Sequence, residues 1–269
     1  MATDIGVSFG QEVGAGASSR SYPAGQNRDR RAEPLPRARL LPSSRGMPRA
    51  REPVPILHRD AHLLVVSKPA GMLSVSTPGA AGLALPDALR LEGFQVLPVH
   101  RLDREVSGAV ILALDEETRA ALEHAFRERT IEKTYWAVAQ GRVQPAQGTH
   151  RFPILEQGSF ARISARGKPS VTGYRTLEKL PTTTVLEIDL VTGRYNQIRL
   201  HFAHAGFPLV GERKYARGKD SPVRFRSRRV ALHSWKVALA HPRTGKRIEV
   251  EAPIPDDLLE LLARASGKK

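Results

Sequence analysis

The segment 99–108 gathers charged side chains directly before an apolar run that is typical of a buried strand. Arg101, Asp103, Arg104 and Glu105 follow one another closely in it. The positive charge of the two arginines favours the ionised form of the Asp103 carboxyl group. An ionised aspartate can act as a nucleophile or as a general base. A structural turn, in which Asp103 only accepts hydrogen bonds from backbone N–H groups, is the alternative that this segment leaves open.

Three segments along the chain together carry a more specific pattern. They are His100-Arg101-Leu102-Asp103 followed by Ser107-Gly108, then Glu132-Lys133-Thr134-Tyr135-Trp136-Ala137, and finally Thr192-Gly193-Arg194-Tyr195-Asn196-Gln197-Ile198-Arg199-Leu200-His201. In type and order they resemble the motifs of the RluA-type RNA pseudouridine synthase family. Two residues depart from the family pattern: Val106 stands where a threonine is usual, and Asn196 stands where a histidine is usual. Asn196 remains a polar residue that can cap a helix.

The resemblance implies an isomerase that detaches uracil from ribose, turns it and rejoins it through a carbon atom, without a cofactor. It implies that Asp103 is catalytic, and it leaves open whether Asp103 attacks the base, attacks the sugar or abstracts a sugar proton. Arg199 would form the ion pair that orients Asp103. Tyr135 would stack on the uracil, and its hydroxyl group would relay the proton that leaves the new carbon–carbon bond.

Reaching a stacked uridine requires flipping it out of the RNA. By the resemblance, Arg101 enters the space that the flipped base leaves. Further RNA contacts are expected from Arg104, Lys133, Arg194, Asn196, Gln197, Arg213 and Lys214. A basic cluster near the C-terminal third of the chain is predicted to contact RNA phosphate groups. Its members are Arg213, Lys214, Arg217, Lys219, Arg224, Arg226, Arg228 and Arg229.

The overall charge agrees with an RNA partner. The 269 residues include 42 Lys and Arg against 27 Asp and Glu, a formal net charge of +15, which favours a polyanion. We expect a monomer that binds rRNA or tRNA. A non-catalytic RNA-binding or ribosome-assembly factor on the same fold is the alternative function. A glycosidase that uses Asp103 and Glu105 is disfavoured, because carboxylates so close in sequence do not by themselves flank a sugar.

Several other classes of protein are excluded or disfavoured. The chain has no cysteine, which excludes disulfide scaffolds and thiol chemistry. We expect no cofactor and no metal site: a nucleotide-binding glycine motif after a strand is missing, and His201 and His204 have no carboxylate in the same helical turn. No apolar run has the length of a membrane span, and the first residues do not resemble a secretory signal, so a cytoplasmic protein is expected.

The pattern of apolar residues predicts two regions. Residues 1–52 are rich in Arg, Gly and Pro and are predicted to be a disordered basic tail, whereas residues 53–269 are predicted to form one catalytic domain. Strands are expected at 56–57, 63–66, 109–114, 132–140, 171–177, 183–191, 230–240 and 247–251. Helices are expected after Asp115, over 196–205 and after Pro255. Strands separated by turns predict an α+β fold around a mixed, largely antiparallel sheet, with the active-site cleft across the sheet.

Overall fold

The computed structural model describes residues 52–76, 79, 82–216 and 225–267. Of the predicted tail only Glu52 belongs to this part, and Arg217, Lys219 and Arg224 of the basic cluster also lie outside it. The elements, in chain order, are β1 (Ile56–Arg59), β2 (Leu63–Lys68), α1 (Leu85–Leu91), β3 (Leu97–Pro98), β4 (Ser107–Ala113), α2 (Glu116–Glu128), β5 (Glu132–Gln140), β6 (Gln147–His150), β7 (Ile154–Gln157), β8 (Phe160–Ile163), β9 (Thr172–Lys179), β10 (Thr183–Leu190), α3 (Gln197–His204), β11 (Leu232–Ala240), β12 (Arg247–Glu251) and α4 (Asp256–Ala265).

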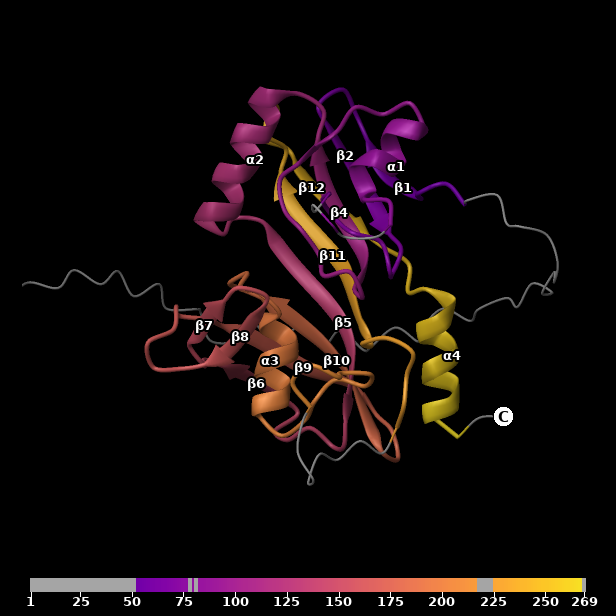
Figure 1. Cartoon of the computed structure of the whole chain (residues 1–269), viewed down its shortest axis with the longest axis vertical. Helices are drawn as coiled ribbons and strands as arrows, with labels where there is room; N and C mark the ends of the chain where they lie inside the picture. Colours follow the sequence, from indigo (N-terminus) through magenta and orange to yellow (C-terminus); the bar gives the residue numbers. More distant parts are fainter. Residues whose placement is uncertain (1–51, 77–78, 80–81, 217–224, 268–269) are drawn as a thin grey trace, which may run out of the picture. The chain divides into compact units, whose positions relative to one another are not determined.

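One large sheet carries the described part of the chain. Its strands are ordered β1-β2-β4-β11-β5-β10-β9-β6, with β12 paired to β11 and β3 paired to β4. Only β4 and β11 run parallel, and every other pair in this sheet is antiparallel. The long strands β5 and β11 lie side by side through its middle (Figure 1). The predicted α+β fold with a mixed, largely antiparallel sheet is confirmed.

The two faces of the sheet bury different side chains, because successive residues of a strand point to opposite sides. In β5, Tyr135 and Ala137 join one core cluster, whereas Trp136 and Val138 join another. Residues of α1 and α3 pack into the cluster of Tyr135, and residues of α2 and α4 pack into the clusters on the other face. The third motif, which begins α3, is therefore brought to the same face of the sheet as Tyr135.

The parallel contact between β4 and β11 depends on a glycine. Gly108 has φ +113°, and a Cβ atom built there would lie 2.2 Å from the backbone oxygen of Ser234. Beside it, the Ser107 hydroxyl group bonds to Nδ1 of the buried His233 at 2.8 Å, and His233 Nε2 bonds to the carbonyl oxygen of Ala252. The Ser-Gly pair of the first motif therefore joins two central strands.

The helices form largely where the sequence predicts them. Asp115 caps α2 by accepting a hydrogen bond from the backbone N–H of Thr118. Arg129 is exposed and ends α2 in the left-handed conformation, with φ +59°. Residues Gln197 to Phe202 of α3 are all buried, so this helix is enclosed rather than packed by one face.

No helix of the described part is long and apolar enough to cross a membrane.

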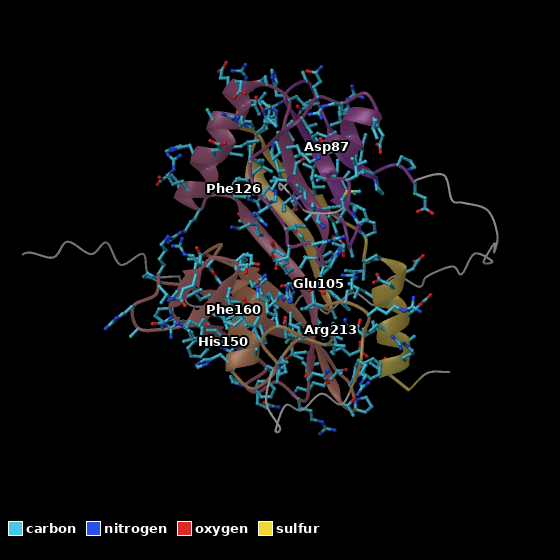
Figure 2. The ribbon with its side chains drawn as sticks, in the orientation of Figure 1. Asp87, Glu105, Phe126, His150, Phe160 and Arg213 are labelled. Carbon is cyan, nitrogen blue, oxygen red and sulfur yellow. The ribbon has the colours of Figure 1, made fainter. Side chains whose placement is uncertain are left out.

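The region between β5 and β9 goes beyond the predicted elements. Here β6 extends the large sheet, and β7 and β8 form a separate two-stranded sheet whose core includes Ile154, Ala161 and Leu200 of α3. The hairpin tip carries Phe160, which is 45% exposed. Phe160 and Arg213 lie toward the end of the described part that holds α3, whereas Asp87 lies toward the opposite end (Figure 2).

Candidate functional site

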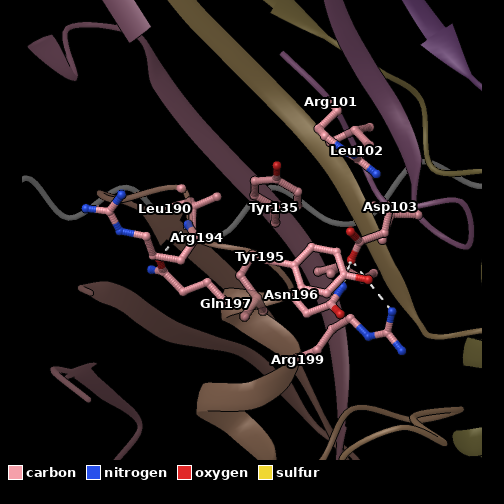
Figure 3. Close-up of a pocket in the computed structure, with 14 residues that line it drawn as sticks. Arg101, Leu102, Asp103, Tyr135, Leu190, Arg194, Tyr195, Asn196, Gln197 and Arg199 are labelled. Atoms are coloured by element: carbon pink, nitrogen blue, oxygen red, sulfur yellow. Dashed lines mark hydrogen bonds and ion pairs between the residues drawn. The ribbon is translucent and has the colours of Figure 1, made fainter. Parts of the chain in front are cut away.

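Two adjoining pockets open beside Asp103 on the face of the sheet that carries Tyr135. Figure 3 draws the residues that line the first of them. Both are lined by Arg101, Leu102, Asp103, Tyr195, Asn196 and Arg199. The first also includes Tyr135, Arg194 and Gln197, and the second also includes Arg104, Arg213 and Lys214. The residues named individually as catalytic or RNA-binding, with the exception of Lys133, each line at least one of the two pockets, whereas Arg226, Arg228 and Arg229 of the basic cluster line neither. The three motifs meet at Asp103.

Asp103 lies on an extended loop that is fixed by its apolar neighbours. Leu102 is buried, and its backbone N–H donates a hydrogen bond to Ser74 Oγ at 2.9 Å. Its carbonyl oxygen accepts a hydrogen bond from the Ser74 hydroxyl group at 2.8 Å. Val106 is also buried, and its N–H bonds to the carbonyl oxygen of Asp103. Because Leu102 points into the core, Arg101 and Asp103 on either side of it point outward. The Asp103 side chain is 21% exposed, so a ligand can reach its carboxylate.

The cation paired with Asp103 is Arg199, whose Nη1 lies 3.6 Å from Asp103 Oδ2. Its guanidinium group also binds Glu212 through two hydrogen bonds, at 2.6 and 3.0 Å, and Glu105 at 3.2 Å. The sequence indicated that Arg101 and Arg104 would supply the charge beside Asp103, but Arg104 Nε instead donates to the carbonyl oxygen of Gly71. A single guanidinium group thus joins three carboxylates.

Burial by itself would lower the pKa of Arg199, but the carboxylates of Glu212, Asp103 and Glu105 raise it well above its ordinary value. Burial likewise acts to raise the pKa of Glu212, and the hydrogen bonds and charge of Arg199 outweigh it, so the net shift is downward. Arg199 and Glu212 form a buried charged pair behind the site. In the sequence Glu212 is recognisable only as one of two acids, with Asp220, beside the basic cluster.

Asn196 contacts Asp103 directly, which corrects the expectation that it caps α3. Its backbone has φ +51° and its side chain forms no capping hydrogen bond. Instead its Nδ2 donates to Asp103 Oδ2 (Figure 3). Its Oδ1 accepts hydrogen bonds from Lys214 Nζ and the Tyr215 hydroxyl group. Asparagine tolerates the left-handed conformation better than most residues, which lets the side chain turn away from the helix start.

Gln197, a predicted RNA contact that lines the first pocket, is bonded mainly within the protein. Its side chain is buried, and its amide bonds to the Thr192 and Thr172 hydroxyl groups, the Val171 carbonyl oxygen and the Arg194 N–H. Both ends of the amide are used inside the protein. Gln197 therefore holds the loop before α3 against β9.

Lys133, a predicted RNA contact, lies away from the two pockets. Its ammonium group lies 5.8 Å from the ring centre of Phe126 in α2. Burial, followed by the nearby charge of Arg129, lowers the pKa of Lys133. Lys133 and Tyr135 share a face of β5 but lie two positions apart along the strand. Tyr135 lines the first pocket, whereas Lys133 lies beside α2.

Tyr135 forms part of the wall of the first pocket. Burial, and then the negative charge of Asp103, raise the pKa of its hydroxyl group well above the ordinary value. Tyr135 is therefore a neutral phenol at any physiological pH. Its ring packs with Ile188 and Leu232 in the core, which fixes its position relative to Asp103.

The basic cluster divides into residues that face solvent and residues that do not. Arg213 and Arg228 are partly or fully exposed. Arg229, in contrast, is buried and pairs with Asp257 through hydrogen bonds at 2.6 and 2.9 Å. Lys214 Nζ is bound to Ser159, Tyr195 and Asn196. Only part of this cluster is therefore available to a phosphate.

Lys68 is a buried charged residue near the site whose importance the sequence did not indicate. Its Nζ donates to the carbonyl oxygens of Pro69 and Met72, at 3.0 and 2.9 Å. Burial, and then the positive charge of Arg229, lower its pKa from 10.5 to about 7, although the charge of Asp103 acts in the opposite direction. These bonds shape the turn that holds the Asp103 loop.

We expect Lys68 to make the free energy of unfolding rise with pH between about 7 and 10.5. In that range the folded protein has released the Lys68 proton while the unfolded chain retains it, so the unfolded state binds more protons. Lys68→Met removes this contribution and should flatten the slope. Urea unfolding at pH 7, 8, 9 and 10 measures it, and the exposed Lys179→Met should leave the slope unchanged. An equal slope in wild type and Lys68→Met would contradict the prediction.

Other chemistries find no support in this geometry. Among the described residues, no group of three or more His, Asp or Glu side chains is arranged to hold a metal ion. His201 is buried, and its Nε2 bonds to the carbonyl oxygen of Phe152. Asp103 and Glu105 bind the same guanidinium group, so they do not face each other across a substrate as the carboxylates of a glycosidase do.

The comparisons with known proteins agree with one another. The family profile described as RNA pseudouridylate synthase matches residues 62–204. An uncharacterised RNA pseudouridine synthase of Mycobacterium bovis is 34% identical over 230 residues, which cover 81% of this chain and 74% of that protein. The ribosomal large subunit pseudouridine synthase D of Nitrosomonas europaea is 34% identical over 224 residues, 78% of this chain and 64% of that protein.

Two solved human structures share the fold. RNA pseudouridylate synthase domain containing 1 superposes with a TM-score of 0.65 at 26% identity, covering 83% of this chain and 98% of that chain. RNA pseudouridylate synthase domain containing 4 superposes with a TM-score of 0.66 at 23% identity, covering 78% of this chain and 92% of that chain.

Proposed function

The chain belongs to the RNA pseudouridylate synthase family, and from that premise we propose that it converts a uridine of large-subunit ribosomal RNA to pseudouridine, with Asp103 as the catalytic residue. The reaction class is that of an isomerase, because no atom is added to or removed from the RNA. The proposed rRNA substrate is supported by relatives named as ribosomal large subunit pseudouridine synthases C and D.

One observation carries the proposed role of Asp103. Its carboxylate lies where two pockets adjoin, with one oxygen bound by both Asn196 and Arg199 and the side chain still accessible. The guanidinium and amide donors stabilise and orient the carboxylate, which is what a nucleophile or base needs before its substrate arrives. This arrangement favours a catalytic Asp103 over the alternative of a non-catalytic RNA-binding factor.

The proposed substrate position follows from the first pocket. A uridine flipped from the RNA enters between Tyr135 and Asp103, and its ring packs against the Tyr135 ring. Since Tyr135 is neutral, it acts as a base only if it passes its own proton to Asp103 while it takes one from the substrate carbon. We therefore assign to Tyr135 contact with the uracil and a proton relay to Asp103.

RNA contacts are assigned to the cations that remain exposed around the pockets. Arg101 lies on the rim, next to Asp103, where a planar guanidinium group can stack on the bases that flank the vacated position. Arg104, Arg194 and Arg213 are the proposed phosphate or base contacts on the same rim. A monomer that works in the cytoplasm without a cofactor remains our expectation.

Mapping of pseudouridines in cellular RNA, with and without this gene, tests the proposal. We expect one or more pseudouridines of large-subunit rRNA to disappear on deletion and to return with wild-type protein, but not with Asp103→Asn. Loss of tRNA sites alone would overturn the rRNA assignment. Restoration by Asp103→Asn as well as by wild type would favour the non-catalytic alternative.

A further inference from the structure

The amide of Asn196 is held from the side opposite Asp103 by two residues that the motifs do not assign to the reaction. Its Oδ1 accepts the Tyr215 hydroxyl group at 3.0 Å and the Lys214 ammonium group at 3.2 Å. We propose that Lys214 and Tyr215 are positioning residues, which lock the Asn196 amide so that its nitrogen, and not its oxygen, faces Asp103. The proposal rests on the catalytic role proposed for Asp103.

The chemistry of the donors determines which way the amide points. A lysine ammonium group has three donors and no acceptor, so only the amide oxygen can face Lys214. Burial raises the pKa of the Tyr215 hydroxyl group, so this group keeps its proton and can donate to the same oxygen. With the oxygen held, Nδ2 must point to Asp103 Oδ2. The opposite orientation would bring an amide oxygen against a carboxylate, where neither atom carries a proton.

Lys214 is itself held firmly in this place. Its Nζ donates to the Ser159 carbonyl oxygen, the Tyr195 hydroxyl group and Asn196 Oδ1, which uses all three donors. It also lies over the rings of Tyr195 and Phe160, at 4.6 and 5.5 Å from their centres. These contacts would be lost if Lys214 turned outward to a phosphate group. The sequence-based prediction of an RNA contact at Lys214 is therefore replaced by an internal role.

The same short segment also supports the second partner of Asp103. The backbone N–H groups of Lys214 and Tyr215 both donate to Glu212 Oε1, and Glu212 holds the Arg199 guanidinium group. Residues 212–215 thus position Arg199 through a carboxylate and Asn196 through two side-chain donors. The two contacts of Asp103 are anchored in one loop, and this explains how a lone carboxylate keeps one orientation while it remains open to the pocket.

A double-mutant cycle tests the proposal. The substrate is total RNA labelled with [5-³H]uridine in cells that lack the gene, and the measurement is the single-turnover rate of tritium release by full-length protein. Lys214→Met and Tyr215→Phe should each reduce the rate about threefold, because the remaining donor still orients the amide. The double variant should lose about a hundredfold, well above the product of the single effects.

Two further arms separate positioning from RNA binding. In an Asn196→Ala background, Lys214→Met should change the rate by less than about twofold, since its effect runs through Asn196. The RNA affinity of Lys214→Met, measured by filter binding, should match that of the exposed-site control Lys179→Met. Three results would overturn the proposal. The single effects on the rate could simply multiply in the double variant, the double variant could keep the wild-type rate, or Lys214→Met could bind RNA more weakly and with a weaker salt dependence. Failure of the proposed function is distinguishable, because wild type would then release no tritium or Asp103→Asn would release as much as wild type.

Discussion

Asp103→Asn is expected to reduce tritium release from [5-³H]uridine-labelled RNA by a factor on the order of 10³ or more, with little change in stability. Asparagine has nearly the same shape and can still bond to Asn196 and lie near Arg199, but it has no negative charge with which to attack or to accept a proton. The partly exposed position of Asp103 makes the fold insensitive to the change. The loss should appear in the single-turnover rate at saturating RNA, because the residue acts on the bound substrate.

A matched control is Asp87→Asn in α1. Asp87 pairs with Arg90 at the surface, toward the opposite end of the described part of the chain (Figure 2). An exposed pair of this kind contributes about 0–1 kcal/mol, so both activity and stability should stay close to wild type. If Asp103→Asn kept a rate within about tenfold of wild type, Asp103 would not be the group that performs the chemistry.

Arg199→Met is expected to lower both activity and stability. The Glu212 side chain is fully buried and pairs with Arg199, so removal of the guanidinium group leaves a buried carboxylate without its counter-charge. Breaking a buried pair in this way costs about 3–5 kcal/mol. Because the unpaired Glu212 would take up a proton more readily than in the unfolded chain, the loss should shrink as the pH falls toward about 5. Chemical denaturation at pH 5 and pH 8 measures both effects.

The double variant Arg199→Met/Glu212→Gln separates the two roles of the arginine. Glutamine removes the stranded charge but keeps an oxygen that accepts the N–H groups of Lys214 and Tyr215. Most of the lost stability should return, whereas activity should not, because Asp103 still lacks its cation. Arg175→Met breaks a pair in which Arg175 is exposed and Glu187 only partly so, and it should cost less stability than Arg199→Met. Recovery of activity together with stability would mean that Arg199 serves the fold alone.

Local patterns in the sequence were sufficient for most of the scaffold. The apolar run after Ser107 predicted a buried strand, and β4 is buried along its whole length. The strand predicted at 132–140 has the same bounds as β5, and the cap at Asp115 was recognised from its position alone. These features depend on residues that are close together in the sequence. The periodic pattern of apolar residues therefore predicts them without knowledge of the tertiary structure. The elements around β7 and β8 are short and weakly patterned, so they were not predicted.

The sequence by itself therefore determined the family, and through the family motifs it singled out the residues proposed to carry the chemistry, namely Asp103, Tyr135 and Arg199. Only the tertiary structure decided what each one touches. Asn196 and Asp103 are 93 positions apart. Their bond forms because the loop before β4 and the start of α3 meet on one face of the sheet. Arg199 was expected to pair with Asp103, yet its two shortest bonds go to Glu212. Gln197 and Lys214 are residue types that commonly contact RNA, yet the Gln197 side chain is buried and the Lys214 ammonium group is bonded within the protein. The sequence shows the chemical type and the spacing of its residues. Charge pairing and burial depend on which segments, distant in the sequence, meet in the fold.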